Sequence, residues 1–180
     1  MIRHALAQRN LQGIQVSTQS LTAALPLELS TLEVRPLFVF QIKVSPPSVI
    51  GATPGHDRRI GEITGGQFEG ERLRGRILSG GSDWQSLRKD GATTLNVRLV
   101  MQTEDGELIA MTYLGIRHGP REVLERIARG ESVNPSEYYM RATPYFETAA
   151  PSYEWLNRLV SVACGHRVAG GAIYQVFEVL

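Results

Sequence analysis

Apolar and polar residues alternate along much of this chain, most regularly in residues 93–103. There the apolar residues occupy every second position: Leu95, Val97, Leu99 and Met101. This period is typical of a strand with one buried face. An Asp105-Gly106 turn signal follows, and residues 108–117 continue as a second strand. The two segments therefore predict a hairpin.

β-forming residues gather in several other segments between glycine or proline breaks. The strands that they predict are residues 37–44, 59–68, 72–78, 138–146, 159–168 and 172–180. Two segments are predicted to be loops: residues 51–59, and the Ser-Gly-Gly-Ser-Asp-Trp segment 79–84. Two others, residues 120–129 and 151–157, begin with proline and carry apolar residues that indicate short helices.

About eight strands and two short helices predict a mainly β domain, in which one antiparallel sheet curls into a barrel. A barrel of this size has room for packed side chains or for one small ligand. We assign residues 31–180 to this single domain. Residues 1–30 sustain neither a helical nor a strand period, and we expect a partly ordered N-terminal arm there.

Charge and composition narrow the class of protein. The chain contains 19 Lys and Arg residues and 18 Asp and Glu residues. No net positive charge therefore favours nucleic acid or an anionic membrane as a partner. One cysteine, no apolar run of roughly 18 residues and no signal-peptide pattern favour a cytoplasmic protein. Pairing through an outer sheet face to form a homodimer is a further expectation.

Five segments occur in an order and spacing that resemble one known family. They are GGQFEG, LRGRILSGGSDWQ, RHGP, EYYMRATPYFET and YEWLN. Together they resemble the domain-of-unknown-function family 3237, also called uncharacterised protein family 311, from about residue 32 to residue 180. The resemblance implies a calycin-like or lipocalin-like antiparallel barrel. Function is mostly unassigned in that family, but one fungal branch is associated with cofactor-free cyclisation of phenolic polyketides, in which an alcohol adds across an alkene.

No motif places this chain in the fungal branch. The resemblance therefore implies no more than acid–base chemistry on a phenolic or carbonyl compound.

Asp83 is the first candidate catalytic residue. Beside Trp84 in a barrel mouth, its carboxyl group would be partly desolvated, which raises a carboxyl pKa and suits proton transfer. Alternatively, Asp83 accepts backbone N–H groups and holds the Gly-Gly-Ser turn. Both interpretations stay open from the sequence.

Tyr139 and Arg141 are the other candidate catalytic residues. Strand alternation puts them on one face, with Tyr138 and Met140 on the other. An inward-facing arginine needs an anionic ligand or a carboxylate partner, because an unmatched buried charge is costly. A structural ion pair or an outward position would account for Arg141 equally well.

Four further residues are candidate ligand contacts, together with Tyr138: Trp84, Trp155, Asn157 and His118. Trp155 is expected as a cavity wall or plug. Asn157 either caps its helix or binds ligand, and His118 is either a base or part of a turn. The sequence has no metal-ligand spacing and no phosphate-binding glycine loop, so neither a metal nor a cofactor is expected.

The sequence thus predicts a small-molecule-binding barrel that acts as a cofactor-independent lyase, isomerase or cyclase. Asp83 would transfer the proton, while Arg141 and Tyr139 would stabilise developing negative charge. The alternative is a lipocalin-like carrier of an apolar or aromatic small molecule. An enzyme requires converging polar groups in the cavity, whereas a carrier requires mainly apolar walls.

Overall fold

The computed structural model describes residues 20–180, which divide into two units at Leu32. In the first unit, the helix α1 (Leu21–Ala24) and the 3-10 helix η1 (Leu27–Leu29) contain no buried residue. Residues 1–19 of the predicted arm lie outside the described residues. The second unit, Glu33–Leu180, holds every strand of the described chain.

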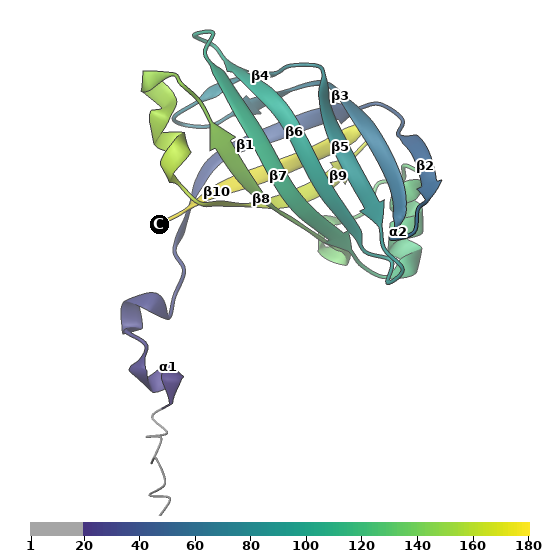
Figure 1. Ribbon diagram of the computed structural model, residues 1–180, viewed down its shortest axis with the longest axis horizontal. Coiled ribbons are helices and arrows are strands. Elements are labelled where there is room, and N and C mark those ends of the chain that lie inside the picture. Colours follow the sequence, from purple (N-terminus) through teal and green to yellow (C-terminus); the bar gives the residue numbers. More distant parts are fainter. Residues whose placement is uncertain (1–19) are drawn as a thin grey trace, which may run out of the picture. The chain divides into compact units, whose positions relative to one another are not determined.

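Ten strands form one antiparallel sheet within residues 20–180. Their bounds are β1 (Val34–Val44), β2 (Ser48–Ala52), β3 (Asp57–Glu69), β4 (Arg74–Ile77), β5 (Gly81–Leu87), β6 (Thr93–Thr103), β7 (Leu108–His118), β8 (Tyr139–Glu147), β9 (Ser161–Val168) and β10 (Gly171–Val179). The order β1-β10-β9-β8-β7-β6-β4-β3 closes on itself because β3 also pairs with β1. The result is a barrel (Figure 1).

Nine of the ten strands fill eight positions around this barrel. β4 and β5 follow each other along the chain and both lie between β3 and β6, so together they fill one position. β2 pairs only with the start of β3 and adds a flap at that edge. The predicted fold, a mainly β antiparallel barrel of about eight strands, is confirmed.

Two predicted loops are strands in the structure. Residues 81–87 form β5, and β2 with the start of β3 accounts for much of residues 48–59. Both segments are rich in glycine and polar residues, so their sequences did not indicate strands. β propensity measures how well a residue fits a half-buried surface, not a polar barrel interior. The consequence is important for the site: Asp83 lies within a strand, and its neighbours alternate between the inside and the outside of the barrel.

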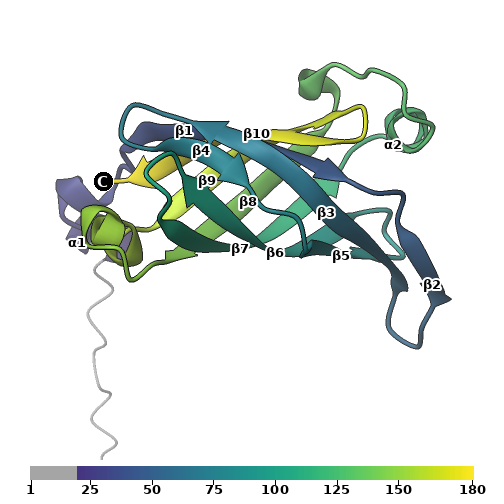
Figure 2. The same cartoon turned by 90° about the horizontal axis from the view of Figure 1, so that it is seen from above.

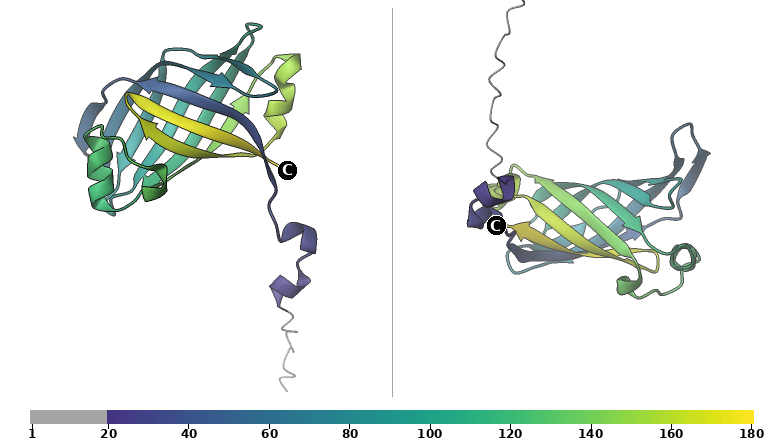
Figure 3. Two further views of the ribbon diagram at one scale, coloured as in Figure 1. Left: turned by 180° about the vertical axis from the view of Figure 1, so that it is seen from behind. Right: turned by 90° about the horizontal axis from the view of Figure 1, so that it is seen from below.

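Helical segments cover the two ends of the barrel (Figures 2 and 3). One end, which we call the α2 end, carries the predicted helix α2 (Arg121–Ala128) and the 3-10 helix η2 (Pro135–Glu137). The opposite end, the η3 end, carries the second predicted short helix, which is the 3-10 helix η3 (Pro151–Arg158). No helix among residues 20–180 is long and apolar enough to cross a membrane.

Aromatic rings fill the η3 half and the middle of the barrel. Near the η3 end, the ring of Phe38 meets Phe68 and Phe146 edge-on, with centroids 6.0 and 5.8 Å apart. In the middle, Phe40 stacks on Tyr174 at 4.8 Å, and the ring of Tyr113 lies 5.5 Å from that of Tyr174. All these side chains are buried. Buried aromatic rings therefore pack against one another from the η3 end to the middle of the interior.

Candidate functional site

Asp83 lies inside the barrel and is almost completely buried, with 5% of its surface exposed. Its Oδ2 accepts a hydrogen bond of 2.7 Å from Nε2 of Gln85, two residues along β5 and therefore on the same inner face. Its Oδ1 is buried without a hydrogen-bond partner in the described part of the chain. Asp83 therefore does not hold a turn, because its segment is a strand and its known partner is a side chain.

Two arginines reach the same interior from neighbouring strands. Arg117 continues the inward-facing series of β7, and Arg167 continues that of β9. The Nε atoms of both are buried without a partner among residues 20–180. Burial lowers the pKa of Arg117, and the neighbouring Arg167 lowers it further. The guanidinium group of Arg117 remains charged, because arginine titrates far above neutral pH.

The pKa of the Asp83 carboxyl is raised above its ordinary value. Burial is the main cause; the hydrogen bond from Gln85 and the charges of Arg167 and Arg117 oppose it without cancelling it. A buried carboxyl group with a raised pKa is suited to giving and taking a proton.

Tyr113 and Tyr174 form the floor below this group. Burial raises the pKa of both phenols, and the nearby Asp83 carboxylate raises each further. The ring of Tyr174 lies against the backbone of Gly165, where an added Cβ would come within 2.4 Å of the ring. Both phenols therefore stay protonated in the interior close to Asp83.

A cavity of about 610 Å³ opens above these groups at the α2 end. Strand residues form its inner wall: Arg59, Gln85, Leu87, Thr93 and Arg117. The loop of residues 88–91 and the helix α2 form its outer wall. Gln85 lines this α2 cavity, and Asp83 lies one layer deeper on the same strand.

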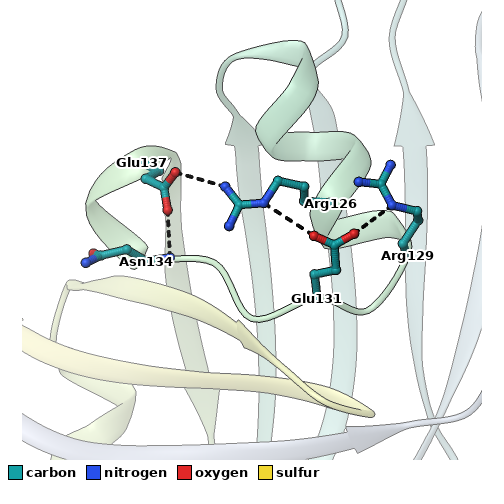
Figure 4. Close-up of polar contacts among 5 residues, drawn as sticks. All are labelled: Arg126, Arg129, Glu131, Asn134 and Glu137. Carbon is teal, nitrogen blue, oxygen red and sulfur yellow. Dashed lines mark hydrogen bonds and ion pairs between the residues drawn. The ribbon is translucent and has the colours of Figure 1, made fainter.

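Helix α2 is held in place by its buried and its exposed faces. Val123 and Ile127 are buried, and Gly130 ends the helix region with a positive φ of 80°. On the exposed side Arg126 pairs with Glu131 and Glu137 at 3.4 and 3.1 Å (Figure 4). Such pairs are individually weak, but the network links α2 to η2 across the connecting loop.

Tyr138 is also at the α2 end. It is buried, its hydroxyl accepts a 2.8 Å bond from the backbone N–H of Arg167, and its Oη lies 2.9 Å from Nδ1 of His166. Tyr138 thus fixes the strand end that carries Arg167. Of the residues singled out in the sequence, Asp83 and Tyr138 are brought together at this end.

Tyr139 and Arg141 do not line the interior, so the predicted convergence of Asp83, Tyr139 and Arg141 is not found. Met140 on β8 and Tyr138 just before it are buried, whereas Tyr139 and Arg141 are exposed. On the outer face, the guanidinium of Arg141 lies 4.9 Å from the centroid of the Tyr139 ring. The ring of His118, another candidate, stacks on the same tyrosine at 4.9 Å. The alternation was predicted, but only the closed sheet decides which face is inside.

Trp84 faces outward as well, because it follows the inward-facing Asp83 on a strand. It is 46% exposed and lies under Arg58, whose guanidinium is 5.6 Å from the ring. The expected pairing of a carboxylate and an indole in one pocket is therefore not observed.

Trp155 and Asn157 lie at the η3 end, away from Asp83. The guanidinium of Arg72 covers the Trp155 ring at 3.4 Å. The side chain of Asn157 accepts from the N–H of Thr148 at 2.9 Å and donates to its carbonyl at 2.8 Å. Asn157 therefore closes the β8–η3 connection, and neither residue lines the α2 cavity.

Five residues near Asp83 were not among the predicted site residues: Gln85, Arg117, Arg167, Tyr113 and Tyr174. One signal was available, since Arg117 extends the alternating series of Ile109, Met111, Tyr113 and Gly115. A charged residue at the end of an inward-facing series is unusual and indicates a site. In residues 20–180, no three His, Cys, Asp or Glu side chains are grouped so that they could hold a metal ion.

Residues 32–179 match the family described as "Protein of unknown function (DUF3237)". The chain belongs to this family. Curated relatives from Rhodopseudomonas palustris and Clostridium acetobutylicum, both named as UPF0311 proteins, are 34% and 33% identical to it. The first alignment covers 83% of this chain and 98% of the relative, and the second covers 79% and 91%.

Several solved structures have the same fold as this chain. The Rhodopseudomonas palustris structure, 34% identical, aligns with a TM-score of 0.81 over 83% of this chain and 99% of that one. A "beta-barrel like protein" from Acinetobacter baumannii is 38% identical, with a TM-score of 0.73 over 83% and 97% of the two chains. A structure described as an enzyme from Penicillium herquei is 16% identical, with a TM-score of 0.63 over 83% and 95%, and shows the fold alone.

Proposed function

We propose that this DUF3237 protein binds a small organic molecule in the α2 cavity and catalyses a cofactor-independent proton transfer on it. The substrate class is a phenolic or carbonyl compound, and the reaction class is a lyase, isomerase or cyclase reaction. The observation that carries the proposal is Asp83: a buried carboxyl with a raised pKa and an Oδ1 without a partner among the described residues.

The neighbours of Asp83 have complementary roles in this proposal. Gln85 donates to Oδ2 and orients the carboxyl, so that Oδ1 is the atom that gives or takes the proton. Arg167, whose charge acts on Asp83, stabilises negative charge that develops on the substrate oxygen, since a fixed charge in a dry site needs no reorganisation. Tyr113 and Tyr174 stay neutral, because their raised pKa values favour the protonated form.

Hydrogen–deuterium exchange at carbon tests this function without knowledge of the natural substrate. Phenols and carbonyl compounds with an acidic carbon-bound proton are incubated with the protein in D2O and followed by NMR. We expect the wild type to accelerate exchange for at least one compound and Asp83→Asn to lose roughly 100-fold or more, as removal of a general acid–base group does. Asp105→Asn, at the η3 end, is the control. Undiminished exchange in Asp83→Asn would rule out the catalytic role.

A non-catalytic carrier is the second candidate. It is favoured by the position of Asp83, which lies behind Gln85 and does not itself line the cavity. A carrier would bind its ligand equally well in the wild type and in Asp83→Asn, and would accelerate exchange for no compound in the panel.

A further inference from the structure

The α2 cavity carries an excess of positive charge. Five of its lining residues are basic and two are acidic. The groove at the η3 end, of about 600 Å³, is lined by two basic and two acidic residues. The whole chain has 19 basic and 18 acidic residues. The excess of positive charge is therefore local to the cavity and does not reflect the overall composition.

Three of these five cations have ion-pair partners among the described residues, but Arg117 does not. On the outer wall Arg88 pairs with Asp90, and Arg121 pairs with Glu125 at 2.8 Å. Arg59, on the inner wall, lies 3.5 Å from Asp57. Arg117 takes part in no ion pair within the described part of the chain.

The one side-chain hydrogen bond of Arg117 is weak. It runs from Nη2 to Oγ1 of Thr93 and is 3.5 Å long, while Nε is buried without a partner among residues 20–180. A buried guanidinium with free donors is costly unless an anion matches it. Such a group is retained where an anion binds, because its planar fork fits a carboxylate with two parallel hydrogen bonds.

The rest of the cavity defines the shape of that anion. Leu87 on β5 and Leu124 and Ala128 on α2 supply apolar surface beside the charged groups. A ligand that contacts both the basic and the apolar lining residues has a compact negative group and an apolar body.

We propose that the α2 cavity recognises a small organic carboxylate with an apolar, aromatic-sized body, and that Arg117 binds its carboxylate group. This inference rests on the proposed function only for the use of the same cavity. It makes Arg117 the residue that selects the ligand, while the reacting group of the ligand points toward Asp83.

Benzoate and its neutral analogue benzamide are the probes, since they share a body and differ in charge. We expect wild-type protein to bind benzoate at least tenfold more tightly than benzamide, roughly the factor that one charge-assisted hydrogen bond contributes. Arg117→Gln should erase this preference, and Arg117→Lys should reduce it, because the charge remains but the fork is lost. Arg141→Gln, on the outer face of β8, is the matched control and should bind both probes as the wild type does.

Amide chemical-shift mapping on the wild type makes the test independent of how the variants fold. Benzoate should perturb the amides of Gly91, Thr93 and Gly119, which surround the cavity. Equal affinities for the two probes, a preference that survives Arg117→Gln, or perturbations confined to other surfaces would each overturn the inference.

The two proposals fail separately. If benzoate binds through Arg117 but no compound exchanges its carbon-bound proton, anion recognition stands and the catalytic proposal fails. If a neutral phenol exchanges through Asp83 while benzoate has no advantage over benzamide, the catalytic proposal stands and the carboxylate inference fails.

Discussion

The two ends of the barrel differ in how well their polar side chains are satisfied by hydrogen bonds and ion pairs. At the η3 end Asp105 accepts hydrogen bonds from Thr103 and Tyr153, and Glu178 pairs with Arg35 and Arg72. At the α2 end, unsatisfied atoms accumulate. All five buried side-chain nitrogen or oxygen atoms without a partner in the described chain lie there, on Asp57, Arg59, Asp83, Arg117 and Arg167.

This difference separates the part of the barrel that holds the fold from the part available for a ligand. Buried polar groups are normally satisfied, and exceptions occur where a site awaits a partner. The η3 end combines satisfied groups with a packed aromatic interior, whereas the α2 end combines unsatisfied charges with a cavity. The same strands build both ends, so the contrast arises from the residues at their two termini.

Phe146→Ala should have the largest effect on stability. The ring is 1% exposed and packs edge-on against Phe38, so its removal leaves a cavity in the solid half of the barrel. We expect a loss of about 3–5 kcal/mol in the free energy of unfolding, measured by urea denaturation. Tyr145→Ala, on the exposed side of the same strand, should stay within about 0.5 kcal/mol. Similar losses for the two variants would contradict the assigned interior.

Asn157→Ala should have an intermediate effect. It removes both hydrogen bonds to Thr148, each worth about 0.5–1.5 kcal/mol, so we expect a loss of about 1–3 kcal/mol. Because Asn157 lies at the η3 end, the exchange activity and the benzoate affinity of the folded variant should not change. A selective loss of binding in a stable variant would instead return Asn157 to the ligand site.

Asp83→Asn and Asp105→Asn should change stability by smaller amounts and with opposite signs. The pKa of Asp83 is raised, mainly by burial, so folding binds protons and the stability of the wild type falls as pH rises from 3.8 through the folded pKa. Asp83→Asn removes this cost and should raise the melting temperature at pH 7, by roughly 2–4 °C if it recovers about 1 kcal/mol. The gain should vanish below pH 3.8.

Asp105 has the reverse linkage. A hydrogen bond from Thr103 lowers its pKa, so its contribution is present above pH 3.8 and is lost as pH falls through the lower folded pKa. Asp105→Asn should therefore melt below the wild type at pH 7 and equal it in strong acid. Thermal melts of both variants from pH 2.5 to pH 8 check the pair, and shifts of the same sign would remove the contrast between the two ends.

Much of the fold could be predicted from the sequence because it is encoded locally. Alternation in residues 93–103 matches the bounds of β6, and the proline, the apolar spacing and Gly130 bracket α2. The β5 segment was missed because Gly80, Gly81 and two serines resemble a turn. Only its pairing with β3 and β6 makes it a strand, and such long-range pairing leaves no local trace.

For the site, the sequence alone determined which residues share a face. It grouped Tyr139 with Arg141 and separated both from Tyr138, because side chains alternate along any strand. Only the tertiary structure decided which face is inside, since that depends on how the sheet closes. Closure placed Tyr139 and Arg141 on the outer surface and brought Asp83, Arg117 and Arg167 together from three strands far apart in the chain.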